Sequence, residues 1–240
     1  MHNISILMMA LIVSSLSTAH ADQPLKHMND RMPSQNRTMI CGCDITRIHN
    51  ELDTSSCSMP QSNLVLKPLI PGEWIAQWMS HLGKDTFEKN YKKAVNDPII
   101  NAYFTDEGYD VFRKSTGVIE GTPKPGFLGG CSINIAKDNS AIFTGSRLGV
   151  IARAALYIEM NYSAKIPTKQ KELFLKYNER FLPSSWEVNR NQSSYAYKGT
   201  WNPLISTIES DGGRHNLNDN TATVKNIEST LDYLINRKYK

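Results

Sequence analysis

The second half of the chain carries a helical hydrophobic pattern. Apolar residues within 147–160, 168–181 and 186–197 recur at intervals of three and four residues, which is the spacing of one helix face. The same spacing over residues 73–82 predicts an earlier helix, which Gly83 is expected to end. These patterns predict a fold whose second half is mostly helical.

Shorter apolar runs in the first half predict strands separated by loops. Residues 39–46 and 63–70 alternate or run apolar over short spans, and residues 131–135 form a shorter candidate. Five glycines and two prolines between residues 117 and 130 predict a long irregular loop. Together with the helices, these runs predict a mixed α+β fold.

The amino terminus has the pattern of an export signal. Residues 4–16 are almost wholly apolar, too short to span a bilayer, and are followed by the small-x-small sequence Ala19-His20-Ala21. We predict a cleaved signal peptide over residues 1–21; a retained anchor is the alternative. The mature protein is then periplasmic or secreted. No later stretch approaches about 18 uninterrupted apolar residues, so no transmembrane segment is expected in the mature chain.

The remaining chain divides into three parts. Residues 22–38 are polar and rich in Pro and Asn, which predicts a flexible segment before the folded domain of residues 39–205. Residues 206–240 are predicted to form a C-terminal extension, with a loop followed by a helix. A domain of this size buries a core without help from metals, so we expect a single folded unit and a monomer.

Composition and charge narrow the function only slightly. The chain is 40% hydrophobic and 21% charged, which is ordinary for a globular protein, and its formal net charge is +4. A mild basic excess suits an anionic partner such as DNA or RNA, although many proteins with this charge bind neither. An unidentified protein partner is the other possibility that the charge leaves open.

The four cysteines fit an oxidising compartment. They are Cys41, Cys43, Cys57 and Cys131. An even number in an exported protein predicts two disulfides, whose pairing the spacing does not decide. A zinc site is the alternative. It is disfavoured because a single residue separates Cys41 from Cys43, where zinc knuckles usually have two to four.

The order of several short motifs resembles the bacterial endonuclease I family. In the first half these are Cys41-Gly42-Cys43-Asp44, Cys57, Leu69-Ile70-Pro71, residues 117–121 and Gly130-Cys131. In the second half they are residues 149–154, Tyr157, residues 173–186 and residues 198–203. Each motif is weak alone, but their shared order and spacing cover residues 39–205.

The resemblance implies a fold and an activity. Members of the family fold as a mixed α/β domain with a ββα-metal core, and they cut DNA, and often RNA, with little sequence preference. A Glu-His pair precedes a Val-Val-Pro step in the family. The histidine is the general base on water, while the glutamate and a downstream asparagine hold Mg²⁺. Hydrolysis needs both the activated water and the divalent ion.

This chain departs from the family at those positions. Lys67 and Pro68 precede the Leu-Ile-Pro step, where the family has Glu and His. Proline has no basic nitrogen, and an ammonium group repels a divalent cation. Glu120 stands at the position of the metal-binding asparagine. The histidine that the family keeps upstream of that asparagine is absent from residues 109–112.

The altered positions, Lys67, Pro68 and Glu120, allow two interpretations. His81, after the motif, and His49, between the cysteines, are candidates for a relocated base, although lone histidines are more often solvated side chains. Alternatively, Lys67 and Glu120 form a salt bridge that fills the former metal position. We therefore expect no cofactor, or Mg²⁺ if the chain is active.

Other conspicuous side chains have two interpretations each. The four tryptophans, Trp74, Trp78, Trp186 and Trp201, either stack on bases or belong to the core, which is the commoner case. Arg147 and Arg153 either contact phosphates or pair with internal carboxylates or carbonyls. The lysines Lys84, Lys89, Lys92 and Lys93 either face phosphates or form an ordinary solvated surface.

Two classes of function follow. The favoured one is a pseudoenzyme: an exported, endonuclease I-like protein that has lost catalysis but binds nucleic acid or protein. The alternative is an active, Mg²⁺-dependent nuclease that hydrolyses phosphodiester bonds in DNA or RNA with a rearranged site.

Overall fold

The computed structural model describes eight segments of the chain. They are residues 38–41, 45–46, 51–52, 65–100, 103–105, 108–122, 133–143 and 145–205. The predicted signal peptide, most of the flexible segment and the C-terminal extension lie outside these residues and stay predictions. Within the described part, no helix is long and apolar enough to cross a membrane.

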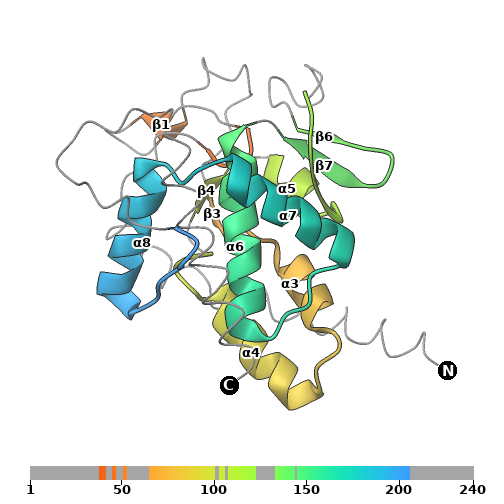
Figure 1. Ribbon diagram of the computed structural model, residues 1–240, viewed down its shortest axis with the longest axis vertical. Coiled ribbons are helices and arrows are strands. Elements are labelled where there is room, and N and C mark those ends of the chain that lie inside the picture. Colours follow the sequence, from red (N-terminus) through yellow and green to blue (C-terminus); the bar gives the residue numbers. More distant parts are fainter. Residues whose placement is uncertain are drawn as a thin grey trace.

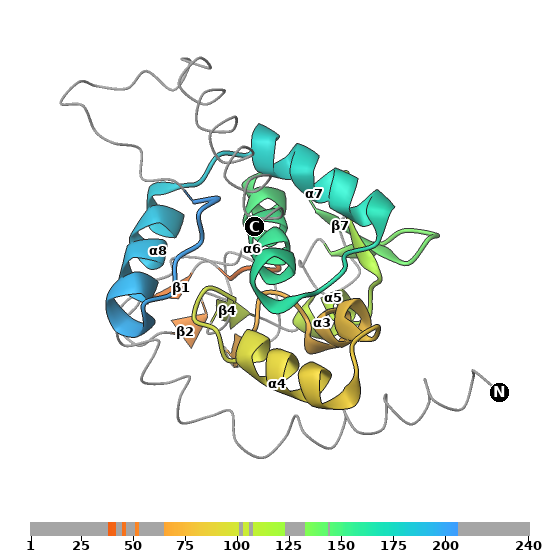
Figure 2. The ribbon, with the colours of Figure 1, turned by 60° about the horizontal axis from the view of Figure 1, so that its bottom comes forward.

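The fold is a mixed α+β arrangement in which helices surround small sheets (Figure 1). The helices are α3 (Gly72–Met79), α4 (Lys84–Val95), α5 (Gly108–Phe112), α6 (Ser146–Tyr162), α7 (Thr168–Arg180) and α8 (Ser185–Lys198). Figure 2 shows α6 in the middle, with α7 and α4 on opposite sides of it and α8 at the edge.

The strands form three small sheets. They are β1 (Ile45–Thr46), β2 (Glu51–Leu52), β3 (Val65–Lys67), β4 (Tyr103–Thr105), β5 (Gly117–Glu120), β6 (Asn134–Ile135) and β7 (Ser140–Phe143). β1 pairs with β2 and β3 with β4, both antiparallel. The third sheet has the order β5-β7-β6, with β5 parallel and β6 antiparallel to β7. This leaves β5 at one edge of the largest sheet.

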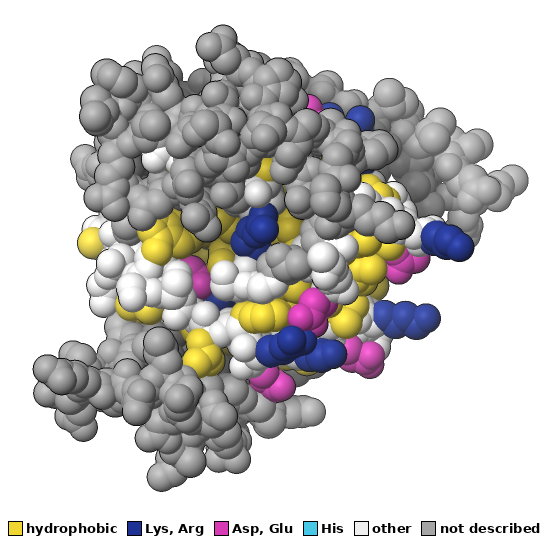
Figure 3. All heavy atoms as spheres, turned by 90° about the horizontal axis from the view of Figure 1, so that it is seen from above, with side chains coloured by type: hydrophobic (Ala, Val, Ile, Leu, Met, Phe, Trp, Pro, Cys, Tyr) yellow, Lys and Arg dark blue, Asp and Glu magenta, His cyan; other side chains and the backbone are white. Residues whose placement is uncertain are grey.

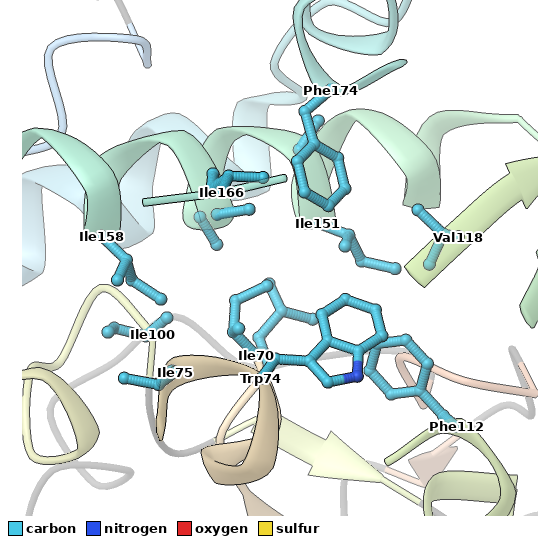
Figure 4. Packing of buried hydrophobic residues seen from close by; sticks show 14 of the residues in the cluster. Ile70, Trp74, Ile75, Ile100, Phe112, Val118, Ile151, Ile158, Ile166 and Phe174 are labelled. Atoms are coloured by element: carbon cyan, nitrogen blue, oxygen red, sulfur yellow. The ribbon is translucent and has the colours of Figure 1, made fainter. Parts of the chain in front are cut away.

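The core joins α3, β5 and α6. Trp74 of α3 lies against Phe112, with ring centroids 5.1 Å apart, and Ile151 of α6 and Val118 of β5 lie nearby (Figure 4). All four side chains are buried. Ten residues of α6 are buried on nearly all sides of the helix, which explains why its sequence is rich in Ala, Leu and Ile.

Side chains from α7 complete the exposed edge of β5. The Gln170 amide accepts a hydrogen bond from the Val118 N–H and donates one to the Val118 carbonyl, each at 3.2 Å. The Tyr177 hydroxyl accepts from the Glu120 N–H at 2.8 Å. An unpaired strand edge invites pairing with another chain, so α7 here takes the place of a further strand.

Gly117 leaves room for the Gln170 side chain at this edge. A Cβ at position 117 would lie 1.6 Å from Gln170 Oε1. We expect Gly117→Ala to displace Gln170 and lower the free energy of unfolding by about 1–3 kcal/mol, measured by urea denaturation. Gly83→Ala is the matched control, since no atom lies within 4 Å of its added Cβ. Equal losses from the two variants would contradict this account.

Several sequence predictions need correction. The helix predicted over residues 73–82 is shorter, ending at Met79, and Gly83 precedes α4 as its N-cap. The predicted loop over 117–130 begins with strand β5, whose hydrogen bonds to β7 overcome the glycine content. The predicted strands over 39–46, 63–70 and 131–135 shrink to β1, β3 and β6 in the described residues.

Candidate functional site

Lys67 and Pro68 lie at the end of β3. Lys67 is exposed, and its register partner on β4 is Tyr103. After Pro68, the Leu69 N–H donates to the Ile100 carbonyl at 2.6 Å, so the two segments stay together beyond the strand. Leu69 and Ile70 are almost fully buried. The Leu-Ile-Pro step therefore anchors the strand end in the core and leaves Lys67 facing solvent.

The helix α3 follows this step directly. Pro71 is its N-cap, and the Pro71 carbonyl accepts hydrogen bonds from the N–H groups of Trp74 and Ile75. The Trp74 indole N–H donates to the Ser115 carbonyl at 2.5 Å. This bond ties α3 to the turn before β5. The two parts of the chain that carry Lys67 and Glu120 are thus linked through the core.

Helix α8 supports the strand opposite Lys67. The Arg190 guanidinium stacks 4.0 Å from the Tyr103 ring centroid, and Trp186 meets the same ring edge-on. The Tyr103 hydroxyl donates to the Ile99 carbonyl. Burial raises the pKa of Tyr103, so this hydroxyl stays protonated at neutral pH and acts as a structural donor.

A buried carboxyl group holds the segment that leads into β4. Asp97 accepts hydrogen bonds from the hydroxyls of Tyr157 and Tyr162 on α6 and from the Ile99 N–H. Burial raises the pKa of Asp97, and these hydrogen bonds oppose the shift. The network fixes the approach to Tyr103, and hence the strand that lies beside Lys67.

Glu120 is paired with Arg180 of α7. The Arg180 Nη1 and Glu120 Oε2 atoms are 2.6 Å apart, and both side chains are partly exposed. The alternative in which Lys67 and Glu120 form a salt bridge is therefore wrong. The two residues lie on different sheets, and the Glu120 carboxylate is paired with a guanidinium instead. Arg180 also lies over the Phe181 ring, which restrains its position.

These residues do not fit a divalent cation. Mg²⁺ prefers carboxylate and carbonyl oxygens, whereas this arrangement offers an ammonium group, a proline and a carboxylate paired with arginine. Across the described segments, no three His, Cys, Asp or Glu side chains gather in a way that would hold a metal ion. We therefore derive no catalytic step through a metal at this position.

The structure does not place a candidate general base beside Pro68. His81 is exposed and lies beyond the end of α3, whereas Pro68 lies before its start. The eight residues of α3 rise about 12 Å between these ends. His81 consequently stands at the far end of the helix from the altered position. His49 lies outside the described residues.

The predicted lysine cluster is real as a surface feature. Lys84, Lys89, Lys92 and Lys93 all lie on α4 and are exposed, together with the acidic residues Asp85 and Glu88. The helix thus carries an excess of two positive charges. The described part of the face seen in Figure 3 also shows basic and acidic side chains interspersed. Among these two surfaces, α4 is the better candidate for phosphate contact.

The predicted phosphate contact at Arg153 is wrong. This residue is 0% exposed, and its Nε and Nη2 atoms donate to the two carboxylate oxygens of Glu187 at 2.9 and 2.8 Å. Its Nη1 donates to the Phe181 carbonyl. The alternative interpretation, a structural pair, is confirmed. Arg147 likewise donates to the Ile40 carbonyl, which confirms the same interpretation for one of its bonds.

The Arg153–Glu187 pair belongs to a larger buried network. Glu187 also accepts from the Ser184 N–H and so closes the capping box at the start of α8. Asn202 donates to the Arg153 carbonyl, and Asn191 exchanges hydrogen bonds with the Asn202 backbone. Sequence reasoning missed this network. Its one local signal was Ser184 three residues before Glu187, the spacing of a capping box.

The structure tests the predictions for the tryptophans and cysteines in part. Trp74 and Trp78 are buried, as the core interpretation predicted, while Trp186 and Trp201 are half-buried. Cys41 is disulfide-bonded and packs against the core. The other three cysteines lie outside the described residues, so the two-disulfide framework stays a prediction.

Two curated proteins are similar in sequence to this chain. Endonuclease-1 of Buchnera aphidicola subsp. Baizongia pistaciae (strain Bp) is 30% identical over 125 residues, a match that covers 48% of this chain and 48% of that protein. The match therefore spans about half the length of that relative. The Extracellular deoxyribonuclease of Aeromonas hydrophila is 23% identical over 220 residues, covering 83% of this chain and 95% of that protein. No protein-family model matches the chain. The chain is thus a distant homologue of the Extracellular deoxyribonuclease over most of its length and of Endonuclease-1 over about half of it.

Proposed function

We propose that this chain is an exported nucleic-acid-binding protein on an endonuclease I scaffold that no longer hydrolyses phosphodiester bonds at the family's catalytic position. The observation that carries the proposal is the pair Lys67-Pro68 at the end of β3, where the family has its metal-binding glutamate and its general base. The ββα-metal-type core and the disulfide framework belong to the same proposal.

The surroundings of this pair support loss of turnover. A proline ring cannot accept the proton of an attacking water, and an ammonium group cannot replace a metal-binding carboxylate. Glu120, at the remaining family position, is neutralised by Arg180. His81, the one histidine among the described residues, lies at the far end of α3 from Pro68. The buried network around Arg153 holds the scaffold together without Lys67, Pro68 or Glu120.

Retained binding is supported by the exposed lysines of α4. A protein that binds DNA phosphates through lysines releases counterions, so its affinity falls as salt rises. We expect duplex DNA binding that weakens with salt, measured by fluorescence anisotropy. Replacing Lys92 and Lys93 with alanine should lower the slope of log affinity against log salt by about one for each lysine that binds a phosphate.

The matched control removes the same charge elsewhere. Lys169 and Lys176 are exposed on α7, which lies on the other side of α6 from α4 (Figure 2). Alanine at these two positions should leave more of the salt dependence intact. If both double variants lower the slope equally, the binding is diffuse and α4 is not its surface.

Catalysis is tested separately by plasmid nicking with Mg²⁺, in a preparation free of host nucleases. We expect no nicking above the level in EDTA. Nicking that Glu120→Ala abolishes would instead establish the alternative function, an active nuclease with a rearranged site.

A further inference from the structure

The C-terminal end of α8 carries an exposed aromatic pair. Tyr195 is 62% exposed, the most exposed large hydrophobic side chain of the described residues. Its ring lies 6.2 Å from that of Trp201, at an interplanar angle of 84°. The pair is far from a core arrangement, because one ring presents most of its surface to solvent.

Buried contacts hold this pair in place. Gly199 ends α8 in the left-handed conformation, with φ of 68°, and turns the chain back toward the helix. The next residues are then fixed by Asn191, which accepts from the Asn202 N–H at 2.8 Å and donates to the Asn202 carbonyl at 3.0 Å. Trp201 is the neighbour of Asn202, so the aromatic surface is formed before any ligand arrives.

The exposed charge along residues 185–205 is positive. Lys198 is exposed, and its Nζ lies 4.8 Å from the Tyr197 ring centroid. The acidic residue of α8, Glu187, is buried against Arg153, and residues 199–205 contain no Asp or Glu. No acidic side chain is therefore exposed along residues 185–205. Lys198 follows Tyr195 by three residues, which is the spacing of neighbours on one helix face. Tyr195, Lys198 and Trp201 together form what we term the α8 platform.

We propose that the α8 platform binds single-stranded nucleic acid by stacking an unpaired base on Tyr195, with Lys198 near the adjoining phosphate. Every base has a flat face, so aromatic side chains beside a cation bind single strands with little sequence preference. In a duplex the bases are already stacked on one another and present only their edges. This inference rests on the proposed nucleic-acid binding but places it at a surface separate from Lys67 and Pro68.

Figures 1 and 2 show the C-terminal end of α4 directed toward the side of the molecule that α8 occupies. A strand that contacts Lys92 and Lys93 at the end of α4 can therefore continue toward α8. The platform would add base contact to a surface that otherwise offers only charge.

The test compares two replacements of one residue in the full chain. Tyr195→Phe keeps the ring, whereas Tyr195→Leu keeps an apolar side chain but removes the flat face. We expect Tyr195→Leu to weaken binding of labelled oligo-dT about five-fold or more, measured by fluorescence anisotropy, and Tyr195→Phe to bind nearly as the wild type does. Affinity for a duplex of equal length should change little in either variant. Leu182→Ala, at another exposed apolar side chain, is the control.

Each result decides between the proposals. Weaker binding confined to Tyr195→Leu and to the single strand supports the platform. Equal affinities for the two Tyr195 variants, or equal losses for single strand and duplex, overturn the platform while leaving nucleic-acid binding intact. If the wild type binds neither oligo-dT nor duplex DNA, the proposed function falls together with this inference. Circular dichroism melting of each variant verifies that the exposed substitution leaves the fold unchanged.

Discussion

Replacing Glu187 with glutamine is expected to lower the free energy of unfolding by about 3–5 kcal/mol, as measured by urea denaturation. The change keeps the size of the side chain and removes its charge. Arg153 is then left as a fully buried cation without a matching carboxylate, because both of its bonds to Glu187 are made inside the core. An uncompensated buried charge costs far more than the pair contributes on balance.

The same chemical change at the surface is the control. Glu73 pairs with Arg113 at 2.9 Å, but both side chains are 39% or more exposed. Solvent and salt screen such a pair, so Glu73→Gln should cost less than about 1 kcal/mol. Similar losses from the two glutamine variants would show that burial of the Arg153 pair contributes little.

The buried network and the Lys67-Pro68 position differ in how far a substitution would disturb the fold. The resemblance in the second half runs through residues that the structure places in the buried network, among them Arg153 and Asn202. Losing one member of that network leaves a buried polar group without its partner. Lys67 and Pro68 lie at a strand end, where Lys67 is exposed and Pro68 is half-buried. Under the proposed function, a change at these positions removes catalytic chemistry without unfolding the scaffold.

The sequence predicted the helices of the second half well because their apolar periodicity is strong. Helix α4 was missed because only Phe87 and Ala94 of its twelve residues are buried, which leaves little pattern to detect. Strands β5 and β7 depend on pairing across about twenty residues of sequence, and a glycine-rich start concealed β5. Hydrophobic patterns within a short window cannot predict pairing between strands that far apart in sequence.

The sequence likewise predicts only part of the candidate site. The assignment of Lys67, Pro68 and Glu120 to the candidate site rests on motif order along the chain and stays a prediction. The sequence does not predict the partner of Glu120. Arg180 is sixty residues away along the chain and reaches β5 only because α7 packs on the edge of that strand. The pairing of Arg153 with Glu187 spans 34 residues and is equally hidden.

Restoring the family's residues should restore hydrolysis. If the proposed function holds, Lys67→Glu combined with Pro68→His should show Mg²⁺-dependent plasmid nicking and the wild type should not. A general base commonly contributes about 10²–10⁴-fold in rate, so the gain should be measurable against background. Adding Glu120→Asn, which also ends the pairing with Arg180, should increase it further.

The control for this reconstruction is Lys67→Glu combined with Pro68→Ala, which supplies the carboxylate but no base. It should remain inactive while melting at nearly the same temperature as the active variant. Nicking by this control as fast as by the histidine variant would mean that the base lies elsewhere in the chain. A folded but inactive triple variant would mean that the loss extends beyond these three positions, since α7 then holds β5 in a geometry that no longer meets the end of β3.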